Sequence, residues 1–288
     1  MKKVFIILCC VLALQSCNKD NTKNETINGF DINWTGDLGK KEKDAVRDMI
    51  SNMVKVEAGT FYMGAQKDSV GHCYDEEATS LEGPVHEVSV SEFYINKYEV
   101  TQLLWEAIMG ETPNKEKDMQ WEDEFGKGDN YPAYRISYNE VETFIGKLNE
   151  YTGLRFSLPT EAQWEYAAKG GKDTYYSLYA GGGDVLEVAW IKSGSIYDIN
   201  KCSEVGKKNA NGLGLYDMSG NVWEMCNNWY YDYKDVCDTI TSGEAYTGYK
   251  VFRGGSWNTN AQQARVTARY KQGIHYRDYN TGFRLVIE

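Results

Sequence analysis

The chain has 288 residues and a formal net charge of −11, from 31 Lys and Arg against 42 Asp and Glu. Nucleic acids and anionic lipid headgroups are excluded as electrostatic partners, because binding to phosphates needs a positive surface and the sequence has no polybasic segment. The length suits one large domain. The 22 Tyr and 28 Gly, against four Pro, favour a loop-rich fold in which aromatic rings are buried and hydroxyl groups tie loops together.

The first 17 residues have the layout of an export signal. Lys2 and Lys3 precede an apolar run over 4–14, which at about 1.5 Å per residue is too short to cross a hydrocarbon core of roughly 30 Å. The run leads to Ser16 and Cys17, which resemble the motif at which a cysteine is lipidated and becomes the new N-terminus. We therefore predict a lipoprotein signal peptide over 1–17, with Cys17 as the lipid acceptor. A cleaved signal in which Cys17 is incidental is the alternative.

The segment 18–37 is rich in Asn, Thr, Lys, Asp and Gly and has few apolar residues, which is typical of a flexible tether. The remainder, 38–288, shows no repeat of fixed period and no shift in composition, so it is predicted to be one domain. Its first element is a short amphipathic helix over 41–53, because four apolar residues recur there at helical spacing: Ala45, Val46, Met49 and Ile50.

Further along, alternating apolar and polar residues predict strands within 53–63 and 85–98. Capping residues followed by apolar residues then predict three helices: Thr101 to Met109, Ser137 with Glu140 up to Gly153, and Thr160 with Gln163 up to Gly170. No helix is predicted beyond Gly171. The chain is therefore expected to be an α+β fold of short helices, small antiparallel sheets and much irregular loop.

Seven segments resemble, in order, signature blocks of the formylglycine-generating-enzyme (sulfatase-modifying factor) family. They are FYMG at 61–64, EGPVHEV at 82–88, EVT at 99–101, LPTEAQWEYAA at 158–168, NGLGLYDMSGNVWE at 211–224, RGGSW at 253–257 and GFR at 282–284. The resemblance covers about 53–286 and implies a variant of the C-type-lectin-like fold. Within these blocks, six residues are expected to stabilise the fold and not to bind a ligand: Arg253, Gly254, Gly255, Gly282, Phe283 and Arg284.

Enzymes of this family oxidise a sulfatase cysteine to formylglycine with oxygen and copper, which two cysteines hold a few residues beyond the Arg-Gly-Gly-Ser block. Thiolates suit this task because they are the soft ligands that bind Cu(I). Here Thr259 and Ala264 stand at those positions, and no cysteine follows Cys237. We therefore predict no catalytic residue and no copper. Cys226 and Cys237 would substitute only if the fold brought them into the same groove.

Other catalytic and metal motifs are missing from the sequence. The three histidines, His72, His86 and His275, lack the paired spacing of a zinc helix site. There is no nucleophile elbow, phosphate loop or dinucleotide fingerprint. Four cysteines follow Cys17, and export permits disulfides, but the sequence does not choose among the three pairings of Cys73, Cys202, Cys226 and Cys237.

Asn221 and Glu224 belong to the block that contributes a calcium site in some members of the family. Side-chain and backbone oxygens are the hard ligands that calcium prefers. We therefore predict calcium at Asn221 and Glu224, against the alternative that both side chains hydrogen-bond the turn. Met225 and Asn228 replace the Trp and Asp common in this block, which weakens the resemblance there.

The segment 257–281 is crowded with Asn, Gln, Arg, Tyr and Thr and resembles the variable segment of retroelement-diversified lectin-like proteins. Tyrosines suit a binding surface because they are rigid and amphipathic. The predicted ligand-binding residues are Tyr270, His275, Tyr276 and Tyr279. Solvent exposure is also expected at Asn258, Asn260, Gln262, Gln263 and Gln272. The alternative is that the tyrosines pack on their own loops.

These observations predict an exported, membrane-anchored, non-catalytic binding or assembly protein of the cell envelope, facing the periplasm or the exterior. Its partner would be a protein or a glycan, its membrane contact would be the N-terminal lipid, and nucleic acid is excluded. Lipoproteins of the family occur in gliding-motility and secretion machinery, which favours assembly. The alternatives are a formylglycine-generating oxidase and a retroelement-diversified ligand-binding protein.

Overall fold

The computed structural model describes residues 24–67, 74–113, 120–172, 177–195, 200–233 and 247–288. Three of its helices begin at the predicted capping residues Thr101, Ser137 and Thr160. Thr101 accepts a hydrogen bond from the backbone of Leu104, and Gly110 closes the helix at φ 76°. Complete capping boxes start the next two predicted helices. The confirmed helices are α1 (Lys40–Ser51), α2 (Gln102–Met109), α3 (Tyr138–Thr152) and α4 (Glu161–Ala168).

Beyond Gly171, where no helix was predicted, the described residues form only two short helical turns. These are α5 (Val185–Val188) and a 3₁₀ turn at Ala261–Ala264. No helix in the described part of the chain is long and apolar enough to span a bilayer.

Each of the two predicted strand regions divides into two strands that belong to different sheets. β4 (Gly59–Met63) pairs only with β5 (His86–Val90). A four-stranded antiparallel sheet has the order β3-β6-β12-β7. It comprises β3 (Met53–Val56), β6 (Phe93–Asn96), β12 (Val286–Ile287) and β7 (Phe156–Ser157). The chain therefore returns at its end to pair with an early strand.

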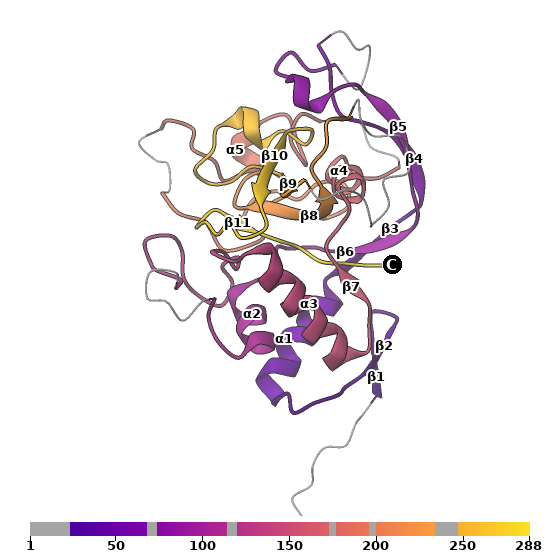
Figure 1. Cartoon of the computed structure of the whole chain (residues 1–288), viewed down its shortest axis with the longest axis vertical. Helices are drawn as coiled ribbons and strands as arrows, with labels where there is room; N and C mark the ends of the chain where they lie inside the picture. The colour runs from indigo at the N-terminus through magenta and orange to yellow at the C-terminus, as the bar shows by residue number, and fades with distance from the viewer. Residues whose placement is uncertain (1–23, 68–73, 114–119, 173–176, 196–199, 234–246) are drawn as a thin grey trace, which may run out of the picture.

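A second four-stranded sheet, of order β10-β9-β8-β11, is built from the C-terminal half. Its strands are β8 (Trp223–Trp229), β9 (Tyr249–Arg253), β10 (Arg269–Gly273) and β11 (Thr281–Gly282). β11 runs parallel to β8, and the other pairs are antiparallel. In Figure 1 this sheet lies above the helices α1, α2 and α3.

The central part of the second sheet, where β8 pairs with β9, is buried on both faces, whereas β10 at its edge is partly exposed. Successive strand residues point to opposite sides, and neighbouring residues here join different hydrophobic clusters. Met225 and Phe252 contact the cluster around the helices, whereas Cys226 and Val251 contact the cluster that contains Trp164. The sheet is thus the middle layer of the domain.

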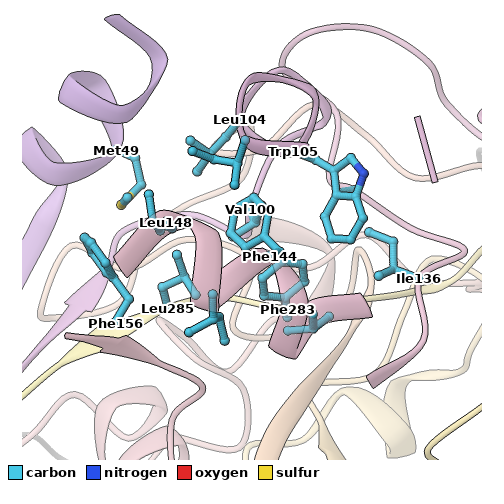
Figure 2. Close-up of a cluster of buried hydrophobic side chains, with 14 of the residues drawn as sticks. Met49, Val100, Leu104, Trp105, Ile136, Phe144, Leu148, Phe156, Phe283 and Leu285 are labelled. Carbon is cyan, nitrogen blue, oxygen red and sulfur yellow. The ribbon is translucent and has the colours of Figure 1, made fainter. Parts of the chain in front are cut away.

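The larger cluster joins the helices to the C-terminal strand region (Figure 2). Trp105 of α2 stacks on Phe144 of α3 with ring centroids 5.3 Å apart. Phe283 meets both rings edge-on, at 6.2 and 5.5 Å. The GFR block near the end of the chain is therefore part of the core, as predicted.

The structure corrects the predicted tether. Residues 24–33 form a hairpin of β1 (Asn24–Ile27) and β2 (Phe30–Asn33), joined by Asn28 and Gly29 at positive φ. Asn-Gly favours this two-residue turn, and Ile32 and Trp34 are buried in the core. The few apolar residues of 18–37 are thus enough for a hairpin because their alternation places them on one face. Residues 18–23 lie outside the described part.

A buried ion pair joins the two four-stranded sheets. The guanidinium of Arg284 donates to both carboxylate oxygens of Glu224, each at 2.6 Å, and both side chains are inaccessible to solvent. Glu224 also accepts a bond from the indole of Trp164 at 2.7 Å. The other N–H groups of Arg284 donate to backbone carbonyls of Asn96, Lys97 and Tyr216.

We expect Glu224→Gln to lower the free energy of unfolding by about 3–5 kcal/mol, because it removes the hydrogen-bonded partner charge of a buried guanidinium. Chemical denaturation measures the change. The matched control is Glu92→Gln, since Glu92 pairs with Lys55 at 3.0 Å but both side chains are half-exposed. Its denaturation midpoint should stay near that of the wild type. Similar midpoints for the two variants would contradict the assigned role of the buried pair.

Candidate binding site

A pocket of about 140 Å³ lies at the surface of the second sheet and is called here the C-terminal pocket. Its walls come from β8, β10, β11 and the loops on either side of β10. The lining residues are Trp223, Asn258, Thr259, Gln263, Tyr270, Gln272, Tyr276, Asp278, Asn280 and Thr281. The segment predicted to carry recognition thus forms a concave surface.

Aromatic stacking positions the tyrosine wall of this pocket. Trp223 is only 3% exposed, and Tyr270 stacks on it with ring centroids 5.1 Å apart. The alternation of β10 places Gln272 on the same face as Tyr270, and its amide donates to the Tyr270 hydroxyl at 3.1 Å. Tyr270 and Tyr276 remain 39% and 40% exposed. Both rings are therefore held by neighbours and still open to a ligand.

Hydrogen bonds also fix the amide wall. The Asn258 side-chain oxygen accepts from the Ser256 hydroxyl at 2.7 Å and from the Asn280 amide at 2.8 Å. The Thr259 hydroxyl bonds to the backbone of Ser256 in both directions, at 2.8 Å each. The polar groups of the pocket are thus organised before any ligand binds.

Close backbone packing fixes the chain at both ends of the segment 257–281. Gly255 has φ 75°, and a Cβ there would lie 2.8 Å from the carbonyl oxygen of Gln263. A Cβ on Gly282 would lie 2.8 Å from the carbonyl oxygen of Ala133. Arg253, Phe283 and Arg284 are fully buried. The structure supports the architectural role predicted for these blocks.

The predicted ligand-binding residues do not all lie in the pocket. Tyr270 and Tyr276 line it, whereas His275 is exposed but is not among the lining residues. Tyr279 is half-buried and stacks on Phe125, with centroids 4.6 Å apart. Of the polar residues expected at the surface, Asn258, Gln263 and Gln272 line the pocket. Asn260 and Gln262 are not among the lining residues. Tyr279 thus packs against the larger hydrophobic cluster and does not line the pocket.

Sequence reasoning missed Trp223, Asp278 and Asn280. Trp223 belongs to the GNVWE block, and nothing local indicates that parallel pairing brings it beside Thr281. Asp278 and Asn280 lie within 257–281, so the polar composition of that segment was the available signal.

Thr259 and Ala264 lie at different depths. Thr259 lines the pocket, whereas Ala264 is fully buried in the 3₁₀ turn. A hydroxyl is a hard ligand and a methyl group is no ligand, so these residues do not fit Cu(I). Cys226 is a free, buried thiol that joins the cluster on the opposite face of the sheet. Cys202 is also free and buried, and Cys73 and Cys237 lie outside the described residues.

Asn221 and Glu224, the predicted calcium ligands, are both engaged in other bonds. Asn221 adopts φ 60°, donates to Glu99 at 2.6 Å and accepts from the backbone of Ser203 at 2.9 Å. Both oxygens of Glu224 accept from Arg284. This set of donors does not fit a divalent cation, because an arginine already occupies the carboxylate. Among the described residues, no cluster of three or more His, Cys, Asp or Glu could hold a metal.

Three buried carboxyl groups share the single positive charge of Arg284. Burial, reinforced by Asp217 and Glu224, raises the pKa of Glu99 well above its usual value. Burial raises the pKa of Asp217 to about 6. Asp217 sits at φ 57° and accepts from the backbone of Gly206 at 2.7 Å. Glu99 and Asp217 therefore lie close to the same buried guanidinium as Glu224.

The sulfatase-modifying factor enzyme 1-like domain matches residues 39–288 of the chain. The chain belongs to this family. Its relatives include chaperone protein LppX of Paenibacillus barcinonensis, 29% identical over 238 residues, which cover 69% of this chain and 81% of the relative. The formylglycine-generating enzyme of Thermomonospora curvata is 26% identical over 302 residues, covering 84% and 95%. The chain spans only 39% of the length of serine/threonine-protein kinase pkn1 of Chlamydia caviae, at 27% identity over 85% of this chain.

Two solved structures superpose on this chain over most of its length. Treponema denticola variable protein 1 superposes with a TM-score of 0.64 at 25% identity, covering 92% of this chain and 98% of that one. PvdO from Pseudomonas aeruginosa gives a TM-score of 0.67 at 25% identity, covering 82% and 94%. The mixed α+β, C-type-lectin-like fold predicted from the signature blocks is confirmed.

We expect Tyr279→Ala to destabilise the protein by about 1–3 kcal/mol, because it removes a ring stacked on Phe125 and tilted against Trp257. The matched change Tyr276→Ala removes an exposed ring and should stay within about 0.5 kcal/mol. Denaturant unfolding of both variants tests this. Equal stability of the two would show that Tyr279 belongs to the open face.

We also expect the stability of the wild type to fall relative to Asp217→Asn as the pH rises from 4 to 6. The pKa of Asp217 is raised from 3.8 to about 6 in the folded protein. Its contribution to stability is therefore fully present below pH 3.8 and is lost as the pH passes 6. Asparagine tolerates the left-handed backbone. Thermal unfolding across this range tests the shift, and a difference that is constant with pH would rule it out.

Proposed function

We propose that this protein is an exported, lipid-anchored, non-catalytic member of the sulfatase-modifying factor family that binds a protein or a glycan at the cell envelope. The C-terminal pocket and the surface around it form the recognition site. Cys17 carries the lipid in this proposal, and the hairpin that begins at Asn24 is the first element after it in the described part of the chain.

The composition of the C-terminal pocket is the observation that carries this proposal. Thr259 lies in its wall where the copper enzymes have a cysteine, so the position that would hold a soft metal ligand holds a hydroxyl. Around it stand exposed tyrosines and amides, which are the groups of a recognition surface. Their mutual hydrogen bonds reduce the ordering cost of binding.

The relatives support binding and assembly in different ways. Treponema denticola variable protein 1 shares the fold over nearly its whole length, and its name describes it as a variable protein. That likeness supports a binding segment, and with it the alternative of a retroelement-diversified protein. Chaperone protein LppX supports the assembly version. The formylglycine-generating enzymes support the oxidase alternative. Thr259 and Ala264 argue against it, because neither side chain is a ligand for Cu(I).

The test is capture of envelope components by the purified domain, with binding measured for three forms. The wild type should retain a specific protein or glycan. The double change of Tyr270 and Tyr276 to Ala should weaken that binding by at least about tenfold, since exposed aromatic anchors carry much of the binding energy. Tyr62→Ala is the matched control, because Tyr62 is 59% exposed on β4, outside the pocket.

Two results would overturn the proposal. Capture that is unaffected by the double change would place recognition elsewhere on the molecule. Copper-dependent conversion of a sulfatase-type cysteine peptide to the aldehyde by the wild type, detected by mass spectrometry, would show that the protein is an oxidase.

A further inference from the structure

The C-terminal pocket contains one carboxylate without a positive partner. Asp278 is the sole ionisable acid among the lining residues, which include no Lys, Arg or His. Its side chain accepts the Tyr276 hydroxyl at 2.5 Å and the backbone N–H of Tyr279 at 2.7 Å. The hydrogen bond with Asp278 raises the pKa of Tyr276. None of the ion pairs recorded among the described residues includes Asp278.

Three buried acids elsewhere in the described residues each have an arginine partner. Glu161 pairs with Arg269 at 2.6 Å, Glu82 pairs with Arg265 at 2.7 Å, and Glu224 pairs with Arg284. The nearby Arg277 is directed to Glu140 at 2.9 Å rather than to Asp278. Asp278, a half-buried carboxylate in a pocket of neutral groups, thus lacks the arginine partner that these three acids have.

The size and walls of the pocket fit one side chain. Pockets for drug-sized ligands have volumes of roughly 300–1,000 Å³, whereas this one has about 140 Å³. Tyr270 and Tyr276 offer ring faces to a planar cation. The side chains of Gln263 and Asn280 offer amide oxygens that accept N–H groups, whereas the Asn258 oxygen already accepts two hydrogen bonds.

The charge of the whole protein favours the same partner. The net charge is −11, and −13 without Lys2 and Lys3 of the signal. A surface of this sign attracts basic segments and speeds their encounter at low salt.

We propose that the C-terminal pocket binds an arginine side chain of a partner protein, with the guanidinium against Asp278 and between the rings of Tyr270 and Tyr276. Arginine is favoured over lysine because its planar group can stack on a ring and donate to a carboxylate and an amide together. This inference rests on the proposed function, since it names the group that the recognition site takes.

The experiment titrates the purified domain with acetyl-Gly-Arg-Gly-amide and with the neutral citrulline analogue, which has nearly the same shape. Calorimetry and amide chemical shifts measure binding. The arginine peptide should bind with a Kd on the order of 1 mM, and the citrulline peptide should bind about tenfold more weakly because it lacks the charge. The lysine peptide should fall between them, and N-acetylglucosamine should not compete.

Variants locate the interaction. Asp278→Asn should weaken arginine binding about tenfold, whereas Asp37→Asn, an exposed acid in the loop between β2 and α1, should leave it unchanged. Tyr276→Phe keeps the ring and releases the carboxylate from its hydroxyl partner, so it should bind the peptide at least as tightly as the wild type. Thermal melts confirm that each variant is folded.

Equal binding of the arginine and citrulline peptides, no saturable binding of the arginine peptide, or full affinity in Asp278→Asn would each overturn the inference. Tighter binding of N-acetylglucosamine would assign the pocket to glycans instead. The arginine inference can fail while the proposed function holds. This would be the result if a captured partner needed Tyr270 and Tyr276 but bound Asp278→Asn as tightly as the wild type.

Discussion

The ion pair between Glu224 and Arg284 is the constraint on which the rest of the domain depends. Glu224 belongs to β8 in the middle of one sheet, and Arg284 lies just before β12 of the other. Their remaining hydrogen bonds reach Trp164 of α4, the backbone at the end of β6 and the carbonyl of Tyr216. A buried ion pair adds little net stability over a hydrophobic contact. Its value is directional, because a carboxylate that accepts three bonds and a guanidinium that donates five allow one relative placement of both sheets and α4.

This placement explains how a polar, irregular segment can be held in one shape. The chain enters the segment through Arg253, Gly254 and Gly255 and leaves it through Gly282, Phe283 and Arg284, and both ends are tied into buried structure. Between them the side chains of the C-terminal pocket bond mainly to one another. Changes at the exposed side chains of the pocket are therefore expected to have little effect on the core, whereas changes at the two ends are expected to destabilise the fold.

Most of the fold could be predicted from the sequence because its determinants are local. Thr101, Ser137 and Thr160 cap their helices wherever those helices lie, and the signature blocks identify the architecture. The tether was predicted wrongly because composition averages over 18–37, whereas burial of Ile32 and Trp34 depends on contacts with distant helices. The site was predicted in part. Tyr270 and Tyr276 could be found from composition, but the burial of Tyr279 and the place of Asp278 depend on long-range packing. The hydrogen bonds of the predicted calcium ligands also depend on long-range packing, since the sequence does not show that Arg284 faces Glu224.

The hairpin also changes how the domain can be presented. With Cys17 lipidated, as proposed, only residues 18–23 separate the lipid from Asn24, and that length of chain spans at most about 25 Å. A tether reaching residue 37 would have allowed roughly three times that distance. In Figure 1 the chain enters the domain at the end formed by β1, β2 and the helices, whereas β10 and β11 lie farther along the long axis. With that anchor, the end that carries the hairpin would be held near the bilayer. A partner that binds the C-terminal pocket then needs to approach from the side away from the lipid, so a soluble partner or one on a facing surface suits this geometry better than a neighbour embedded in the same leaflet.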